Sequence, residues 1–224
     1  MVPTGPVLSG WFARVRGRPI RARRDTRTVT APLFAAEPLA GIALVVALAA
    51  WIVSEVLIGR RHPPSATNPV GRGTGVAVGL GLVAVYVGGP VLSLTVTETT
   101  ITTAPLLLFV AGLAIALAGQ GFRLRAVREL GAAFTFELQT VAGQRVIDTG
   151  PYARIRHPSY TGALICALGF TLAYTNWLAP LTVLALAAAY VVRIPAEERM
   201  LVDALGDPYR RYIARTWRLI PHVL

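Results

Sequence analysis

The residues that could do chemistry lie in two polar clusters of a chain made mostly of Ala, Val, Leu and Gly. The first cluster is GPYARIRHPSYTG, residues 150–162, with two Pro, two Tyr, two Arg and one His. Pro158 suits the first turn of a helix, where its missing N–H costs no hydrogen bond. A helix that begins near His157 offers N–H groups to an anion, with Tyr160 able to stack on a flat ring and Gly162 permitting close approach. On composition alone, an anchor at the membrane interface is the more typical explanation.

The second cluster is RIPAEERMLVDALGDPYRRY, residues 193–212. We predict that Arg193 ends an apolar segment, that Pro195 breaks its helix, and that Glu197 and Glu198 lie in the first turn of a new helix. Carboxylates at that position complement the helix dipole. The dipole explains one acid well and an adjacent pair less well.

A separate interfacial helix is predicted after Gly206 and Pro208, which should end the preceding helix. Apolar side chains share one face of residues 209–220, and Arg occupies the other; the apolar ones are Tyr209, Ile213, Trp217 and Ile220. This pattern is typical of an amphipathic helix that lies on a membrane.

Apolar segments must position these clusters. Hydrophobic residues make up 54% of the chain and charged residues only 15%, whereas soluble domains carry about 25% charged residues. The apolar segments cover roughly residues 33–58, 74–97, 103–122, 158–175 and 176–193. The first three are long enough to span a bilayer as helices, and the last two predict a tight hairpin. We therefore predict an all-α, polytopic membrane helix bundle with about five transmembrane helices, a cytoplasmic loop at 123–157 and the C-terminal interfacial helix.

Charge indicates the partner and the orientation. The net charge is +11 and all 22 basic residues are Arg. Because these Arg residues flank apolar segments, anionic lipid is the expected partner rather than nucleic acid. Five spans place 15 Arg on the face that carries the C-terminus and 7 on the other face, all within residues 1–30. The positive-inside rule then puts the C-terminal face in the cytoplasm. Arg, Ala and Gly richness without Lys indicates a bacterial inner or cell membrane.

In this order, the two clusters resemble the isoprenylcysteine carboxyl methyltransferase family and its phospholipid methyltransferase relatives. The resemblance covers roughly residues 105–224 and includes LRAVRELGAAFTFEL, which is similar to the family segment after the third span. Gln144 is a departure, since many members have His there. The chain divides accordingly into an Arg-rich arm at 1–30, membrane helices without a recognised signature at 31–104, and a methyltransferase core at 105–224.

The resemblance implies a membrane methyltransferase whose S-adenosylmethionine binds at the cytoplasmic mouth of the bundle. The cofactor-binding residues that it implies are Gly150, Pro151, Tyr152, Arg156, His157, Pro158, Tyr160, Gly162, Glu197 and Glu198. Arg193 and Glu197 are the expected catalytic residues, with Arg193 orienting an acceptor carboxylate bidentately. A snorkelling Arg at the end of a span is an equally good explanation of Arg193. No metal site is expected.

Other residues within the apolar segments receive structural interpretations. Gly119 and Gly121 match the Gly-x-Gly of the phospholipid relatives weakly, and helix packing is favoured for both. An acid within a span is a functional candidate, but Glu55 lies one turn from the end of its span and is expected to be an exposed structural residue. The single Cys166 is expected in the core.

The leading hypothesis is carboxylate O-methylation of a lipophilic acceptor that enters from the bilayer. Small residues on the spans, namely Gly112, Ala116 and Gly169, would leave a gap between helices, although tight packing also explains them. One alternative is a lipid amine N-methyltransferase, which would leave Arg193 with little to do. Another is a membrane scaffold without catalysis, which cofactor binding would distinguish. Related sterol reductases use NADPH but need more spans. The sequence leaves the acceptor and the oligomeric state open.

Overall fold

The computed structural model describes residues 31–62, 72–136, 138 and 143–221, and within them it contains helices and no β-strands. The Arg-rich arm predicted at 1–30 lies outside the described residues. The helices are α1 (Leu33–Ala36), α2 (Pro38–Arg61), α3 (Arg72–Val83), α4 (Gly89–Thr95), α5 (Pro105–Leu130), α6 (Pro158–Ala173), α7 (Val183–Leu205) and α8 (Asp207–Arg215). A π-helical turn, Ala84–Gly88, joins α3 to α4. The predicted all-α class is confirmed.

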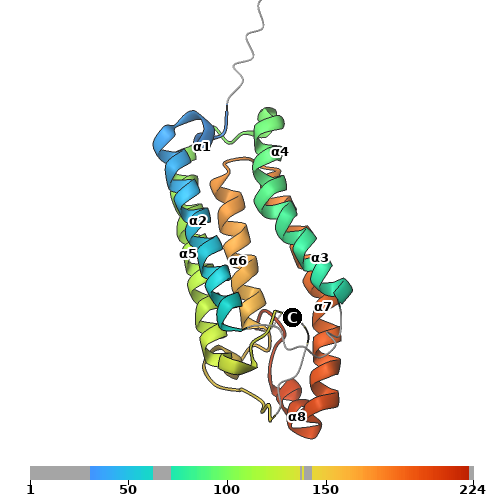
Figure 1. The fold of residues 1–224 in the computed structure, drawn as a ribbon. Helices are drawn as coiled ribbons and strands as arrows, with labels where there is room; N and C mark the ends of the chain where they lie inside the picture. The colour runs from blue at the N-terminus through green and yellow to red at the C-terminus, as the bar shows by residue number, and fades with distance from the viewer. Residues whose placement is uncertain (1–30, 63–71, 137, 139–142, 222–224) are drawn as a thin grey trace, which may run out of the picture.

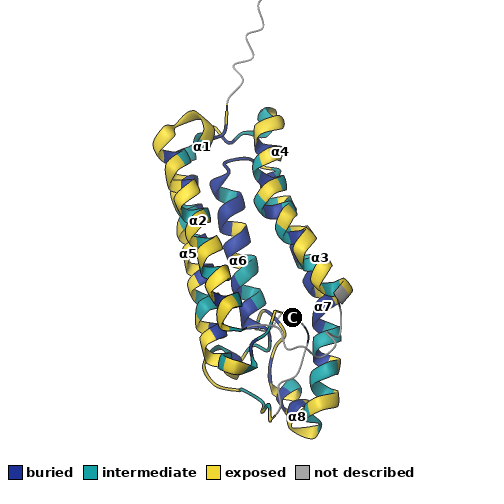
Figure 2. Ribbon diagram, in the orientation of Figure 1, coloured by how far each residue is buried: buried dark blue, intermediate teal, exposed yellow. Residues whose placement is uncertain are grey.

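Four helical stretches of the described chain are long and apolar enough to cross a membrane: Pro38–Arg61, Gly73–Thr95, Pro105–Ala133 and Ala179–Leu205. The remaining predicted span, the fourth at 158–175, is α6, which is apolar but has only 16 residues. At 1.5 Å per residue it is roughly 24 Å long, somewhat less than the hydrocarbon core. Figure 2 shows α6 as the most deeply buried long helix, with exposed residues on the outer sides of α2 and α3.

Helices α5 and α6 pack backbone against backbone through glycines. A Cβ on Gly119 would lie 2.4 Å from the nitrogen of Cys166, and one on Gly169 would lie 2.2 Å from the nitrogen of Ala116. Gly112 and Gly162 make similarly close approaches across the same interface. Small residues are typical of such contacts in membranes.

These contacts test the roles that were predicted for several small residues. Packing is confirmed for Gly119, whereas a Cβ on Gly121 would meet nothing within 4 Å. The predicted gap at Gly112, Ala116 and Gly169 is wrong, because these residues bring α5 and α6 together. Cys166 is fully buried in the core, as expected.

Helix α7 continues through Pro195, so the predicted helix break there is wrong. A proline in a helix removes one N–H donor and crowds the preceding turn, but neighbouring helices can compensate for this in a membrane bundle. Glu197 and Glu198 consequently lie well inside α7 rather than in a first turn, and a dipole role does not explain them. The helix ends at Gly206, whose φ of +62° lies in the left-handed region, as predicted.

The C-terminal helix is shorter than predicted, since α8 ends at Arg215, and it buries Tyr209 and Tyr212. The predicted apolar face is therefore wrong: Trp217 and Ile220 lie beyond the helix and are exposed. The chain after α8 pairs with residues 154–157 instead, through backbone bonds that include Arg156 N–H to the carbonyl of Trp217 at 2.7 Å. Figure 1 shows α8, the start of α6 and the end of α7 at the same end of the bundle.

Candidate active site

A cavity of about 400 Å³ lies where these elements meet. Its wall is formed by α2, α3, α5, α6, α7 and α8, together with the loop that follows α5. One end is polar, with Arg156, His157, Arg193 and Glu197 in the wall. A ligand here would contact the N-terminal helices as well as the C-terminal core, because α2 and α3 form part of the cavity wall.

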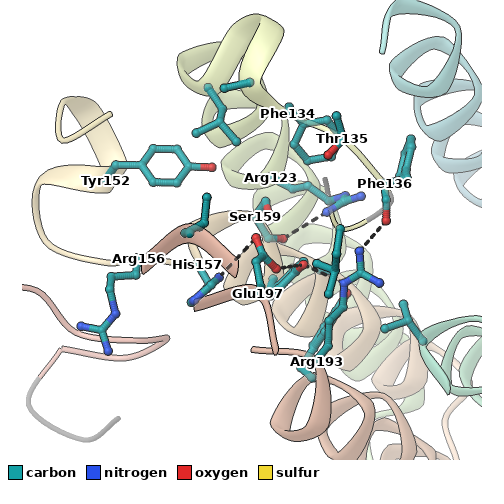
Figure 3. Close-up of a pocket in the computed structure, with 18 of the residues that line it drawn as sticks. Arg123, Phe134, Thr135, Phe136, Tyr152, Arg156, His157, Ser159, Arg193 and Glu197 are labelled. Atoms are coloured by element: carbon teal, nitrogen blue, oxygen red, sulfur yellow. Dashed lines mark hydrogen bonds and ion pairs between the residues drawn. The ribbon is translucent and has the colours of Figure 1, made fainter. Parts of the chain in front are cut away.

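Tyr160, in the first turn of α6, connects two charged residues of α7. The Tyr160 hydroxyl donates to Glu197 Oε2 at 2.5 Å and accepts from Arg193 Nε at 2.9 Å. The Tyr160 ring is stacked between His157 and Tyr190, with centroid distances of 5.5 and 4.4 Å. Figure 3 shows Arg193 and Glu197 near each other on the cavity wall. The predicted catalytic pair thus forms one hydrogen-bonded chain through Tyr160.

The two adjacent glutamates have different surroundings. Glu197 lines the cavity. Glu198 has a side chain that is only 9% exposed, and it binds Arg156 Nε at 2.7 Å and Arg218 at 3.2 Å. His157 Nε2 lies 3.3 Å from Glu198 Oε1. Successive helical residues point about 100° apart, so one carboxylate faces the cavity and the other holds the C-terminal segment in place.

The predicted cofactor residues divide into two groups. Those that line the cavity are Tyr152, Arg156, His157, Tyr160 and Glu197. Those that lie outside its lining are Gly150, Pro151, Pro158, Gly162 and Glu198. The second group has structural positions: Gly150 has a φ of +54°, Pro158 begins α6, and Gly162 faces the backbone of α5 at Arg123.

Arg193 is engaged along one edge. Its Nε binds Tyr160, and its Nη2 donates to the carbonyl of Phe136. Its Nη1 faces α3, 3.8 Å from the position that a Cβ on Gly75 would occupy. The guanidinium is therefore held in orientation inside the cavity, and its Nη1 end is directed away from Tyr160.

An ion pair between Glu55 of α2 and Arg123 of α5 was not predicted from the sequence. Glu55 is bound bidentately by Arg123, with both N–O distances 2.8 Å, and its side chain is 20% exposed. The expectation that Glu55 is exposed is therefore wrong. Both residues line the cavity. Charged residues inside apolar segments were the available signal, but the pairing joins residues 68 positions apart.

Three tyrosines close the cavity at the end formed by α8. The Tyr212 hydroxyl donates to the carbonyl of Tyr152 at 2.8 Å. Burial, followed by the charge of Glu197, raises the pKa of both Tyr152 and Tyr209 well above the ordinary range. Burial likewise raises the pKa of Tyr212. All three tyrosines therefore stay neutral at physiological pH and present rings and hydroxyls rather than charge.

The cavity lining that comes from α2 and α3, called the apolar end here, is apolar apart from Glu55. Trp51 of α2 stacks on Tyr86 with a centroid distance of 3.9 Å. Val78 and Leu82 of α3 line the same region. The cavity therefore joins a polar end near the loops to an apolar end among the helices, which suits an amphipathic ligand.

Comparisons with known proteins concern the part of the chain that builds most of this wall. Residues 110–203, from α5 to α7, match the model of the isoprenylcysteine carboxyl methyltransferase (ICMT) family. A protein-S-isoprenylcysteine O-methyltransferase of Schizosaccharomyces pombe is 36% identical over 100 residues, which are 42% of this chain and 41% of that protein. Protein-S-isoprenylcysteine O-methyltransferase B of Arabidopsis thaliana is 30% identical over 118 residues, which are 50% of this chain and 58% of that protein. The chain spans about half the length of these relatives.

A solved structure of a eukaryotic intramembrane Ras methyltransferase, ICMT, has a similar fold. It gives a TM-score of 0.58 over 81% of this chain and 66% of that chain, at 22% identity. This likeness agrees with the predicted membrane helix bundle. The relatives named above are eukaryotic, so they give no support to the bacterial origin predicted from composition.

Proposed function

We propose that this chain is a membrane methyltransferase that uses S-adenosylmethionine and methylates the carboxylate of a lipophilic acceptor, because residues 110–203 match the model of the isoprenylcysteine carboxyl methyltransferase family. The observation that carries the proposal is the chain of hydrogen bonds from Arg193 through Tyr160 to Glu197 in the cavity wall. In this proposal Arg193 would hold one substrate and Glu197 the other, on either side of a single tyrosine.

The residues of the wall fit the chemistry of the cofactor. When bound, S-adenosylmethionine supplies an electrophilic methyl group on a sulfonium. Glu197 offers a carboxylate to an ammonium group, and the neutral rings of Tyr209 and Tyr212 offer apolar faces to a flat base. The cavity volume of about 400 Å³ lies within the usual range for small-molecule sites.

Arg193 fits the acceptor. Its Nε and Nη2 are fixed by protein groups, and its Nη1 end can hold a carboxylate at a defined angle. A carboxylate is already a nucleophile at neutral pH, so the site needs to align it and exclude water rather than remove a proton. An amine acceptor would find no use for this cation, which argues against the lipid N-methyltransferase alternative.

The names of the relatives describe an S-isoprenylated cysteine as their acceptor. Such a group combines a carboxylate with a long apolar tail. In this chain the tail would occupy the apolar end at Trp51, Tyr86 and Leu82. Each methylene buried there contributes about 0.8 kcal/mol, so affinity should rise with tail length until the space is filled.

The cofactor part of the proposal is tested by comparing the two adjacent glutamates. Glu197→Gln should weaken S-adenosylhomocysteine binding at least tenfold in calorimetry, with little change in the melting temperature. Glu198→Gln should instead lower the melting temperature, since it breaks a buried cluster with Arg156, His157 and Arg218. No binding by the parent chain, or unchanged affinity in Glu197→Gln, would contradict the assignment.

A further inference from the structure

The ion pair between Glu55 and Arg123 is built with several supporting contacts. Gln120, one turn before Arg123 on α5, donates from Nε2 to Glu55 Oε1 at 3.0 Å and to Ser54 Oγ at 2.8 Å. The Arg123 side chain is 9% exposed. Both carboxylate oxygens of Glu55 and two nitrogens of Arg123 are used in the pair, so the plane of the guanidinium is fixed.

The fixed guanidinium reaches the first turn of α6. Arg123 Nη1 donates to the carbonyl of Ser159 at 3.3 Å, directly before Tyr160. Figure 3 shows this contact on the cavity wall, beside the groups that surround Glu197. The position of Arg123 is thereby linked to the residue that joins Arg193 to Glu197.

On the basis of the function proposed above, we propose that Glu55 is a positioning residue for methyl transfer and acts by holding Arg123. Glu55 lies on α2, outside the segment that matches the family model. The inference therefore adds a charged residue of the N-terminal part of the chain to the proposed site.

The physical reason is competition between two cations in one cavity. Arg123 and Arg193 both line it, but the charge of Arg123 is balanced by Glu55. Without that carboxylate, the buried guanidinium lacks a counter-charge and can reorient toward the carboxylate of an acceptor. The acceptor would still bind, but displaced from Arg193 and out of line with the methyl group. Loss of Glu55 should therefore lower kcat more than it raises KM.

The experiment compares Glu55→Gln, Glu55→Asp, Arg123→Gln and the Glu55→Gln/Arg123→Gln double variant. The matched control is Glu98→Gln, which makes the same change at an exposed residue between α4 and α5, at the opposite end of the bundle. For each variant we would measure kcat and KM with an S-prenylated cysteine analogue, S-adenosylhomocysteine affinity, and the melting temperature.

Glu55→Gln should lower kcat at least tenfold, with KM and S-adenosylhomocysteine affinity within about threefold of the parent. Glu55→Asp keeps the charge and should recover part of the activity. The double variant should be no slower than the slower single variant, because both substitutions act on one unit. Glu98→Gln should behave as the parent.

A Glu55→Gln variant with more than half of the parental kcat would overturn the proposal. So would multiplicative losses in the double variant, or a parallel loss of cofactor affinity and melting temperature, which would indicate a purely structural pair. A parent chain that binds the cofactor analogue but transfers no methyl group would contradict the proposed function itself, and the role of Glu55 would fall with it.

Discussion

Among single residues, Tyr160 is central to the proposed function, because its hydroxyl contacts both Arg193 and Glu197. Hydrogen bonds to charged groups are worth about 1.5–3 kcal/mol. Stacking with His157 and Tyr190 holds the ring independently of the hydroxyl. A change at the hydroxyl alone should therefore affect function more than folding.

Tyr160→Phe should lower kcat/KM for the acceptor by roughly 10- to 100-fold, the equivalent of that hydrogen-bond energy. The melting temperature should change little, since the ring stack remains. Tyr174→Phe is the matched control: it removes a buried hydroxyl that has no hydrogen-bond partner among the described residues. If both variants lost activity equally, the hydroxyl of Tyr160 would have no specific role.

The positions of some of these residues could be predicted from the sequence, and those of others could not. The resemblance to the methyltransferase family implied that His157, Tyr160, Arg193 and Glu197 share a site, and these residues do line one cavity. The different roles of Glu197 and Glu198 depend on the rotation of α7, which the predicted break at Pro195 obscured. The partner of Glu55 could not be identified, because a tertiary contact between distant helices leaves no local pattern.

Among the elements, α5 and α6 form the rigid base of the site. Their glycine contacts fix the start of α6 against Arg123. The sequence did contain this signal, because small residues at helical spacing favour packing. The path of the chain after α8 was not predictable in the same way, since the backbone pairing of Trp217 and Arg218 with residues 154–157 is independent of side-chain type.

Gly169→Ala should destabilise the bundle, because a Cβ there would lie 2.2 Å from the backbone of Ala116. Overpacking of this kind costs typically about 1–3 kcal/mol. Gly121→Ala makes the same change on α5 where a Cβ meets nothing within 4 Å. Thermal unfolding in detergent should show a lower melting temperature for Gly169→Ala only. Equal melting temperatures would mean that the two helices can separate without cost.

For the whole molecule, the arrangement of the helices places the C-terminal ends of α2 and α5 and helix α8 at one end (Figure 1). The residues that line the cavity lie at this end, and the five-span prediction assigns 15 of the 22 Arg residues to the same end. Hydropathy located the apolar helices, of which four in the described chain are long enough to cross a membrane. The cavity could not be predicted in this way, since it arises from packing between α2, α3 and the C-terminal helices.

The orientation remains a prediction from the positive-inside rule. A reporter fused after Leu224 should be cytoplasmic, and one inserted at Glu98 should be on the opposite side of the membrane. Together these results would place the cavity on the cytosolic side, where S-adenosylmethionine is available. A cytoplasmic reporter at Glu98 would overturn the predicted orientation.

The central claim is methyl transfer to a carboxylate, and the chemistry of the product tests it most directly. Purified protein would be incubated with methyl-labelled S-adenosylmethionine and an S-prenylated cysteine analogue, and the product would then be treated with alkali. A methyl ester releases its label as volatile methanol, whereas a methylated amine retains it. We predict alkali-labile label that depends on the acceptor and is strongly reduced in Arg193→Gln. Alkali-stable label, or no transfer by a folded protein that binds the cofactor analogue, would contradict the account.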